Sequence, residues 1–321
     1  MHDLRAQFPV LAHHAYLNAG TSGPVPARAV AAAEESLRRQ LDGGRGGREF
    51  FESMFEMDAE LRARVAGLVN CRPEELIVTG ATTDGINAAL LALDLRPGDE
   101  VLTSDEEHPG LLAPLAVARQ SRGVRLRVAP FEELPGEIRP DTRLVACSHV
   151  SWLTGRIMDT SALAASSAIV LLDGAQGLGA VWVDVAALGC DFYAASGQKW
   201  LCGPNGLGYL YVRPELCPQL DPPWPGYHVL EDPSQPLESA LHEDARRLGT
   251  GLGAAHQLAF ALGALDVLEE AGVAAVQARA VGLAGMLAEQ LGEQGRDVSP
   301  RDETTLVTFG ERTQRAEVTV T

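Results

Sequence analysis

Short apolar runs recur along the chain, each bounded by turn-forming residues. Seven of them have the length and residue content of buried strands; in chain order they are EELIVTG (74–80), DEVLTSD (99–105), VRLRVAP (124–130), TRLVACSHV (142–150), AIVLLDGAQ (168–176), CDFYAASG (190–197) and LGYLYV (207–212). Helix-like segments separate them. Apolar strands that alternate with helices indicate a mainly parallel sheet covered on both faces, which is an α/β architecture.

The pattern changes in the C-terminal third. A proline-rich segment, 214–236, has little periodicity and predicts a long loop. Two helices are predicted after it, over 256–270 and 273–291, with a glycine at position 272 between them. After these helices the one clear strand is TLVTFG, 305–310.

With 321 residues, of which 46% are hydrophobic, the chain is long enough to bury one large core and a smaller one. We expect an N-terminal arm over 1–20 and a large domain over 21–255. The remaining segment, 256–321, is expected to be the start of a smaller, truncated α/β domain.

The formal net charge is −17. An acidic field repels phosphate backbones, so nucleic acid is not expected as a partner, and an anionic cofactor would need local binding groups. No apolar run reaches the ~18 residues of a membrane-spanning helix, and the N-terminus lacks the build of a signal peptide. We therefore expect a cytoplasmic protein that does not enter a membrane.

The five cysteines, at positions 71, 147, 190, 202 and 217, form no C-x-x-C pair. An odd number without metal-site spacing indicates neither a disulfide framework nor a zinc site. They are interpreted as small core residues.

Lys199 follows a predicted apolar strand in DFYAASGQKW and precedes the glycine-rich turn CGPNGLG. A lysine at the end of a buried strand has two interpretations. It can extend its amine past the strand into solvent, or it can be a Schiff-base lysine, whose amine must be neutral to attack an aldehyde. Burial lowers a lysine pKa by ~3–5 units, so desolvation alone would supply such an amine.

Asp173 ends another apolar strand, where an unpaired carboxylate is costly and needs a cationic partner. The alternative is an aspartate that caps a helix or forms a turn. In pyridoxal 5′-phosphate (PLP) chemistry, a carboxylate at this place keeps the pyridine nitrogen protonated, and the protonated ring stabilises a carbanion. Gln176 follows at a spacing that suits a hydrogen bond to the phenolic oxygen of the ring.

The segment 76–93 reads as strand, turn and helix, with Thr82, Thr83 and Asp84 at the helix start. Free amides at a helix N-terminus are a natural phosphate site, and a plain N-cap is the alternative. His108, after the strand DEVLTS, has the planar ring needed to stack on a cofactor, although a lone histidine is more often structural.

These motifs occur in a fixed order: Thr-Thr at a helix start, Glu-His-Pro, Ser-His, Asp-Gly-Ala-Gln and Ser-Gly-x-Lys. In this order, over about residues 17 to 260, the chain resembles the PLP enzymes of the aminotransferase class V family. YLNAGTSGPVP, EHPGLLAPL, SHVSWLTG, DGAQGLGA and DFYAASGQKWLCGPNGLGYLYV look most like cysteine/cystine C–S lyases. They also resemble cysteine desulfurases and isopenicillin N epimerase-like proteins.

The resemblance implies a PLP-dependent transferase fold of type I, with a mainly parallel seven-stranded sheet. It implies that Lys199 carries the cofactor, that His108 stacks on the ring, that Asp173 pairs with the ring nitrogen and that Gln176 reaches the ring oxygen. It places Thr83 of the helix start, and Ser196 and Gln198 of the lysine segment, at the phosphate. The hydroxyl of Thr82 at the same helix start is expected to bind the phosphate as well.

At the phosphate site the chain departs from many relatives, which carry histidine in place of Gln198. Glutamine can still donate a hydrogen bond, but it adds no positive charge. In the family a Gly-Thr pair from the second subunit completes this site, and Gly249-Thr250 is the matching place. A homodimer is therefore implied.

Relatives continue into a small domain that supplies an arginine for the substrate carboxylate and, in desulfurases, a cysteine that accepts sulfur. Neither can be placed here: Arg312 and Arg315 precede the expected position, and Cys202 is interpreted as packed. We expect a PLP lyase that acts on a sulfur-containing amino acid by β-elimination, giving pyruvate, ammonia and sulfide or persulfide. The alternatives are a class V aminotransferase, a cysteine desulfurase, an epimerase-like enzyme, or a truncated PLP-binding chain with little activity.

Overall fold

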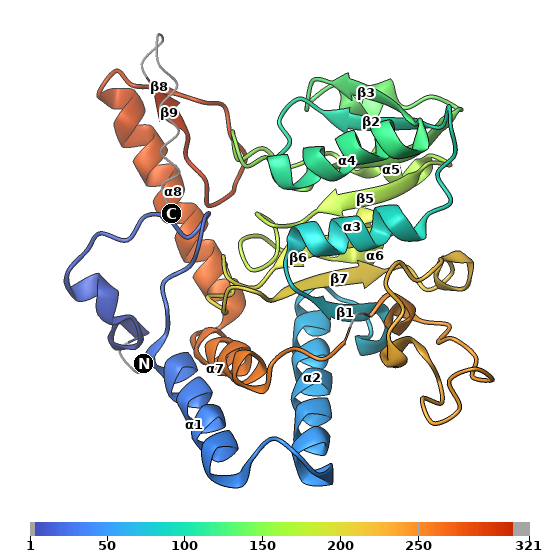
Figure 1. Cartoon of the computed structure of the whole chain (residues 1–321). Coiled ribbons are helices and arrows are strands. Elements are labelled where there is room, and N and C mark those ends of the chain that lie inside the picture. The colour runs from blue at the N-terminus through green and yellow to red at the C-terminus, as the bar shows by residue number, and fades with distance from the viewer. Residues whose placement is uncertain (1–3, 250, 311–321) are drawn as a thin grey trace.

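The computed structural model describes residues 4–249 and 251–310 (Figure 1). All seven strands predicted for the large domain are present in one sheet. They are β1 Leu76–Thr79, β2 Glu100–Ser104, β3 Arg125–Ala129, β4 Thr142–Ser148, β5 Ile169–Asp173, β6 Phe192–Ser196 and β7 Gly208–Val212. The prediction of a seven-stranded α/β sheet is confirmed.

The order across the sheet is β1-β7-β6-β5-β4-β2-β3. β7 runs antiparallel to both of its neighbours, β6 and β1, so β1 points the same way as β6. The pairs β6–β5, β5–β4, β4–β2 and β2–β3 are parallel. Six strands therefore point in one direction, and their carboxyl ends meet at one edge of the sheet.

Helices cover both faces of the sheet, as the apolar strands require (Figure 1). On one face, α3 (Thr82–Ala92) and α4 (Pro109–Arg122) bury Ile86, Leu90, Leu111 and Leu115 against the strands. On the other, the main core contains side chains from α2 (Arg48–Leu68) and α7 (Ala255–Ala271), with the short helices α5 (Ser161–Ala165) and α6 (Val185–Leu188) nearby.

The two C-terminal helices form where the sequence predicts them. α7 ends at Ala271, and α8 (Val273–Glu293) begins after Gly272, whose φ of 81° is readily adopted only by glycine. α1 (Ala27–Gly43) packs along α7, so the start of the chain lies against its C-terminal part. The proline-rich segment is a loop with short 3₁₀ turns, as expected.

The prediction of a strand over 305–310 is wrong for most of that range. Only Phe309–Gly310 (β9) is part of a paired strand, and its partner is Asp297–Val298 (β8). The preceding threonines bind a loop instead: Thr304 Oγ1 donates to the Gly155 carbonyl at 2.7 Å, and Thr308 Oγ1 donates to the Leu153 carbonyl at 2.5 Å. These side-chain contacts hold the segment on loop 151–157, so it forms no ladder with a strand there.

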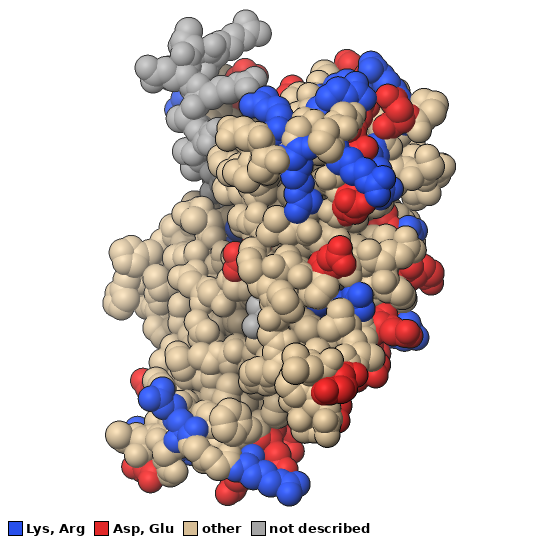
Figure 2. Space-filling view, turned by 45° about the vertical axis from the view of Figure 1, so that its right-hand side comes forward, with Lys and Arg blue, Asp and Glu red and all other residues tan. Residues whose placement is uncertain are grey.

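Acidic and basic side chains are interspersed on the surface at the β2–β3 edge. Figure 2 shows both signs side by side on that part of the molecule, and Arg127 of β3, for example, contacts Glu100 at 2.9 Å and Glu137 at 2.8 Å. Among the described residues, no helix is long and apolar enough to cross a bilayer. The expected cytoplasmic location stays a prediction.

Candidate active site

The predicted site residues meet at the carboxyl edge of the sheet, where ligands collect in open α/β folds. The segments after β1, β2, β4, β5 and β6 enclose a cavity of about 130 Å3. It is lined by Ala81, Thr82, Thr83, His108, Ser148, Val150, Trp152, Asp173, Ala175, Gln176, Ser196, Gln198 and Lys199. Every predicted cofactor contact within the described residues is in this lining; Thr250 lies outside the described residues.

Lys199 is the only lysine in the sequence. Its side chain is partly buried, and this desolvation lowers the pKa of its amine, while the nearby Asp173 carboxylate opposes the shift. The lysine count, which was not used in the prediction above, is the simplest signal for this site in the sequence. The chain has 26 lysine and arginine residues, and its single lysine lies in this cavity.

The turn that carries Lys199 is held by the N-terminal arm. The amide of Gly23 donates to the Gln198 carbonyl at 2.7 Å. A Cβ atom on Gly23 would lie 2.2 Å from the carbonyl oxygen of Lys199, so no other residue fits without moving the turn. The close approach of these two backbones fixes where Lys199 begins.

Asp173 is 5% exposed at the end of β5. Burial raises the pKa of its carboxyl, and three influences oppose the rise: the Ala175 amide, which donates to Oδ1 at 2.9 Å, and the positive charges of Lys199 and His108. The turn-forming role and the site role therefore coexist in one side chain. A cation placed in the cavity would stabilise the ionised form of this carboxylate.

His108 is the N-cap residue of α4. Its Nδ1 accepts a hydrogen bond from the Gly110 amide at 2.9 Å, so the proton of the neutral ring is on Nε2. Burial and the Lys199 charge lower its pKa, which favours the neutral form. The ring meets Trp152 edge-on, with centroids 5.0 Å apart and planes at 81°.

Two hydroxyls in the cavity wall have no hydrogen-bond partner among the residues that the structure describes. Thr82 Oγ1 and Ser196 Oγ are buried and unpaired, although buried polar atoms are normally satisfied. α3 also begins without a side-chain cap at Ala81, which leaves its first amides free. Unpaired hydroxyls beside free helix amides are the donor set that an oxyanion requires, so this part of the lining fits a phosphate group.

Gln176 is fixed at both ends of its amide. Nε2 donates to the Gly20 carbonyl at 2.9 Å, and Oε1 accepts from Trp200 Nε1 at 2.9 Å. One amide hydrogen is left for a further contact. The N-terminal arm thus touches the site a second time, through Gly20.

Comparison with known proteins accounts for this arrangement. A model of the aminotransferase class-V family matches residues 15–310. The chain belongs to the aminotransferase class-V family. Its fold is the type I fold of PLP enzymes: the cystine C–S lyase C-DES, in complex with cysteine persulfide, is similar with a TM-score of 0.87 and 27% identity, covering 94% of this chain and 85% of that one.

Two other relatives illustrate the range of the family. The probable cysteine desulfurase of Methanothermobacter thermautotrophicus is 33% identical over 68% of this chain. The cysteine desulfurase of Serratia proteamaculans is 35% identical over 70%. The matched region spans 58% and 60% of these curated relatives, respectively.

Two residues of this class-V site were missed by the sequence analysis. Ser148, at the end of β4, lines the cavity, and Glu107, which precedes His108, accepts three hydrogen bonds behind it. Trp152 was quoted only as part of a motif. The sequence shows Glu107 as an acidic residue after an apolar strand. Its burial could not be predicted from this, because it requires that β2 and β4, which are distant in sequence, lie side by side.

The cysteines of this class-V chain are poor nucleophiles in the structure. Burial raises the pKa of the thiols of Cys71, Cys202 and Cys217 to about 12, and it also raises those of Cys147 and Cys190. A thiol with such a pKa is protonated near neutral pH. Cys202, the cysteine nearest to Lys199 in sequence, is 8% exposed, as the packed interpretation expects.

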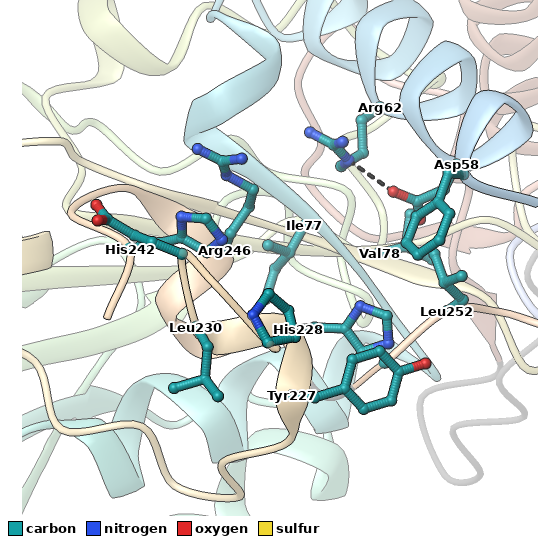
Figure 3. Close-up of a pocket in the computed structure, with 15 residues that line it drawn as sticks. Asp58, Arg62, Ile77, Val78, Tyr227, His228, Leu230, His242, Arg246 and Leu252 are labelled. Atoms are coloured by element: carbon teal, nitrogen blue, oxygen red, sulfur yellow. Dashed lines mark hydrogen bonds and ion pairs between the residues drawn. The ribbon is translucent and has the colours of Figure 1, made fainter. Parts of the chain in front are cut away.

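A second and larger cavity, of about 350 Å3, lies between α2, β1 and the segment 227–252 (Figure 3). Arg62 in its wall is paired with Asp58 at 2.8 Å. The cavity has no lysine in its lining, so it cannot hold a Schiff base. Gly249 and Gly251 are part of the lining, which places the cavity beside the segment expected to reach a second subunit.

The buried Glu107 carboxyl generates a test of stability against pH. Burial raises its pKa from 4.5 to about 7, so the folded state binds its proton more tightly than the unfolded state. Its contribution to stability is complete below about pH 4.5 and is lost as the pH rises through about 7. Glu107→Gln removes this loss, and relative to wild type it should gain up to about 3 kcal/mol between pH 5 and 8.

Urea denaturation of the cofactor-free protein at pH 5, 6, 7 and 8 measures the effect. Glu106→Gln is the matched control, because its carboxylate is only partly buried, and it should follow wild type. Parallel pH profiles for Glu107→Gln and wild type would show that Glu107 has an ordinary pKa in the folded protein.

Proposed function

We propose that this chain binds PLP through Lys199 and catalyses β-elimination from cystine or cysteine. The observation that carries the proposal is the one lysine of the chain, placed in the cavity at the carboxyl edge of the sheet beside a buried carboxylate. The family assignment implies PLP as the cofactor. The unpaired hydroxyls of Thr82 and Ser196 support it, because they fit a phosphate group.

The lining residues divide into three roles. Thr82, Thr83, Ser196 and Gln198 would hold the phosphate. Asp173 would accept a hydrogen bond from the ring nitrogen and keep it protonated. His108 would lie against the ring, and the free amide hydrogen of Gln176 would reach the ring oxygen. PLP, when bound, supplies an electron sink for the electron pair released at the substrate Cα.

Lys199 would also move the proton. Once its amine is released by the incoming amino acid, partial burial favours the neutral form that can remove the Cα proton. With a thiolate or persulfide leaving group on Cβ, elimination then needs no protein nucleophile. No arginine is among the described residues of the lining, so the substrate carboxylate would be bound by groups outside it.

Elimination is the reaction for which the described residues supply the groups, because it needs no cysteine that accepts sulfur. All five cysteines are within the described residues, none lines the cavity, and each has a raised pKa. The similarity to C-DES, named a cystine C–S lyase, supports the same choice. The similarity to cysteine desulfurases makes desulfuration the second candidate.

The covalent link to Lys199 is directly testable. Loaded protein should be yellow, and borohydride should fix a pyridoxyl group to Lys199, because the chain offers no other lysine. Peptide mapping by mass spectrometry checks the position. Lys199→Arg keeps the charge and should lose both colour and label; a label on the N-terminal amine instead would refute the assignment.

The reaction is tested by product analysis. Cystine and cysteine are supplied without a keto acid, and pyruvate and alanine are measured together. Pyruvate should be the main product, and Asp173→Asn should reduce turnover by far more than PLP occupancy, because phosphate contacts hold the cofactor in place. Alanine as the main product would indicate a desulfurase; product only with an added keto acid would indicate an aminotransferase.

The homodimer is also part of the proposal. Large apolar side chains are exposed along α1 and α2, among them Leu37, Leu41, Phe51 and Phe55, and such exposure marks interaction surfaces. Gly249 lies beside this region in the wall of the larger cavity, which also includes Phe55.

Sedimentation should therefore give a dimer for wild type and a monomer for the double variant Phe51→Glu, Phe55→Glu. Val128→Glu, on the edge strand β3 with 59% exposure, introduces the same charge at the other edge of the sheet and should remain dimeric. A wild-type monomer at micromolar concentration with bound PLP would contradict the dimer.

A further inference from the structure

Glu107 is a buried carboxylate, 4% exposed, that lies behind the lining residue Ser148. It accepts a hydrogen bond from Ser104 Oγ at the end of β2, and two from Ser148 at the end of β4. Ser148 N donates at 3.0 Å and Ser148 Oγ donates at 2.5 Å. These three donors stabilise the ionised form of the carboxylate and so oppose the effect of burial, which raises its pKa.

These contacts determine what Ser148 presents to the cavity. A serine hydroxyl has one proton and two lone pairs. Because the proton of Ser148 is directed at Glu107, only the lone pairs remain for other partners. Ser148 lines the cavity, and its Cα is paired with that of Asp173 across β4 and β5. The hydroxyl oxygen is therefore an acceptor in the same cavity lining as Asp173.

We propose that Glu107 is a positioning residue: through Ser148 it keeps a second hydrogen-bond acceptor and a negative charge next to Asp173, which favours a cation in the cavity. The inference rests on the proposed function, since the cation would be the protonated form of the cofactor bound to Lys199. It adds a residue that touches neither cofactor nor substrate.

The charged group near Glu107 is acidic, and no basic side chain is among its described contacts. The charged group that acts on it is Asp173 of β5, and the thiol of Cys147 in β4 also feels its field. Asp173 adds negative charge, whereas the Cys147 thiol is protonated near neutral pH. The positive groups of the site, Lys199 and His108, act on Asp173. A cation beside Asp173 would therefore balance two carboxylates rather than one.

Glu107→Gln reverses this arrangement with little change in shape. The amide oxygen can still accept from Ser104 and from the Ser148 amide. The amide nitrogen then faces Ser148 Oγ and donates to it, which frees the serine proton to point into the cavity. The acceptor becomes a donor, and the negative charge is lost. Both changes disfavour a cation beside Asp173.

The experiment is a pH titration of the visible absorption of PLP-loaded protein, with PLP itself as the probe. Wild type is compared with Glu107→Gln, Ser148→Ala, the double variant, and Glu106→Gln as the matched control. The apparent pKa of the pH-dependent absorption change should be about one unit lower in Glu107→Gln than in wild type. In Ser148→Ala the same pKa should be lowered by a smaller amount. In the double variant the decrease in this pKa should be smaller than the sum of the two single decreases, because Glu107 acts through Ser148. Glu106→Gln should match wild type.

Every outcome bears on the inference. The same pKa in Glu107→Gln and wild type would overturn it, as would an equal fall in Glu106→Gln. If the pKa decrease in the double variant equals the sum of the two single decreases, Glu107 does not act through Ser148. If Glu107→Gln does not fold, Ser148→Ala alone must lower the pKa. If wild type forms no absorbing species with PLP, the proposed function fails and the inference with it.

Discussion

The burial of Asp173 and Glu107 at one edge of the sheet is the constraint on which the site depends. Two carboxylates, Asp173 at the end of β5 and Glu107 after β2, are held out of water, and no arginine is among the described residues that line the cavity. The chain supplies its one lysine to this cavity. Amides and hydroxyls partly stabilise each carboxylate, but no positive group in the described part of the lining neutralises both of them. The cavity therefore suits a ligand with a positive group beside the carboxylates and a negative group beside the unpaired hydroxyls.

Two segments distant in sequence close this site. The N-terminal arm touches the Lys199 turn through Gly23 and the amide of Gln176 through Gly20. On the other side, loop 151–157 carries Trp152 to His108, and the threonines at 304 and 308 bind its carbonyls. Thr154 Oγ1 also donates to Glu106 at 2.8 Å, next to the two residues that the site uses.

The sequence was sufficient for the elements whose signal is local. Each strand of the main sheet is an apolar run bounded by turn residues, and parallel strands place their carboxyl ends together, so Thr82, His108, Asp173 and Lys199 could be assigned to one site. The failures are non-local. Thr304–Thr308 has strand-like residues, but its hydroxyls bind a loop, and Glu107 looks like a surface residue until β2 and β4 are brought together.

The most direct test of the account is the crystal structure of the protein with PLP. It should show continuous density from Lys199 Nζ to the cofactor, with the ring between His108 and Asp173 and the phosphate at Thr82 and Ser196. PLP bound in the cavity beside Gly249 and His228, or not bound to Lys199, would contradict the claim that the carboxyl edge of the sheet is the active site.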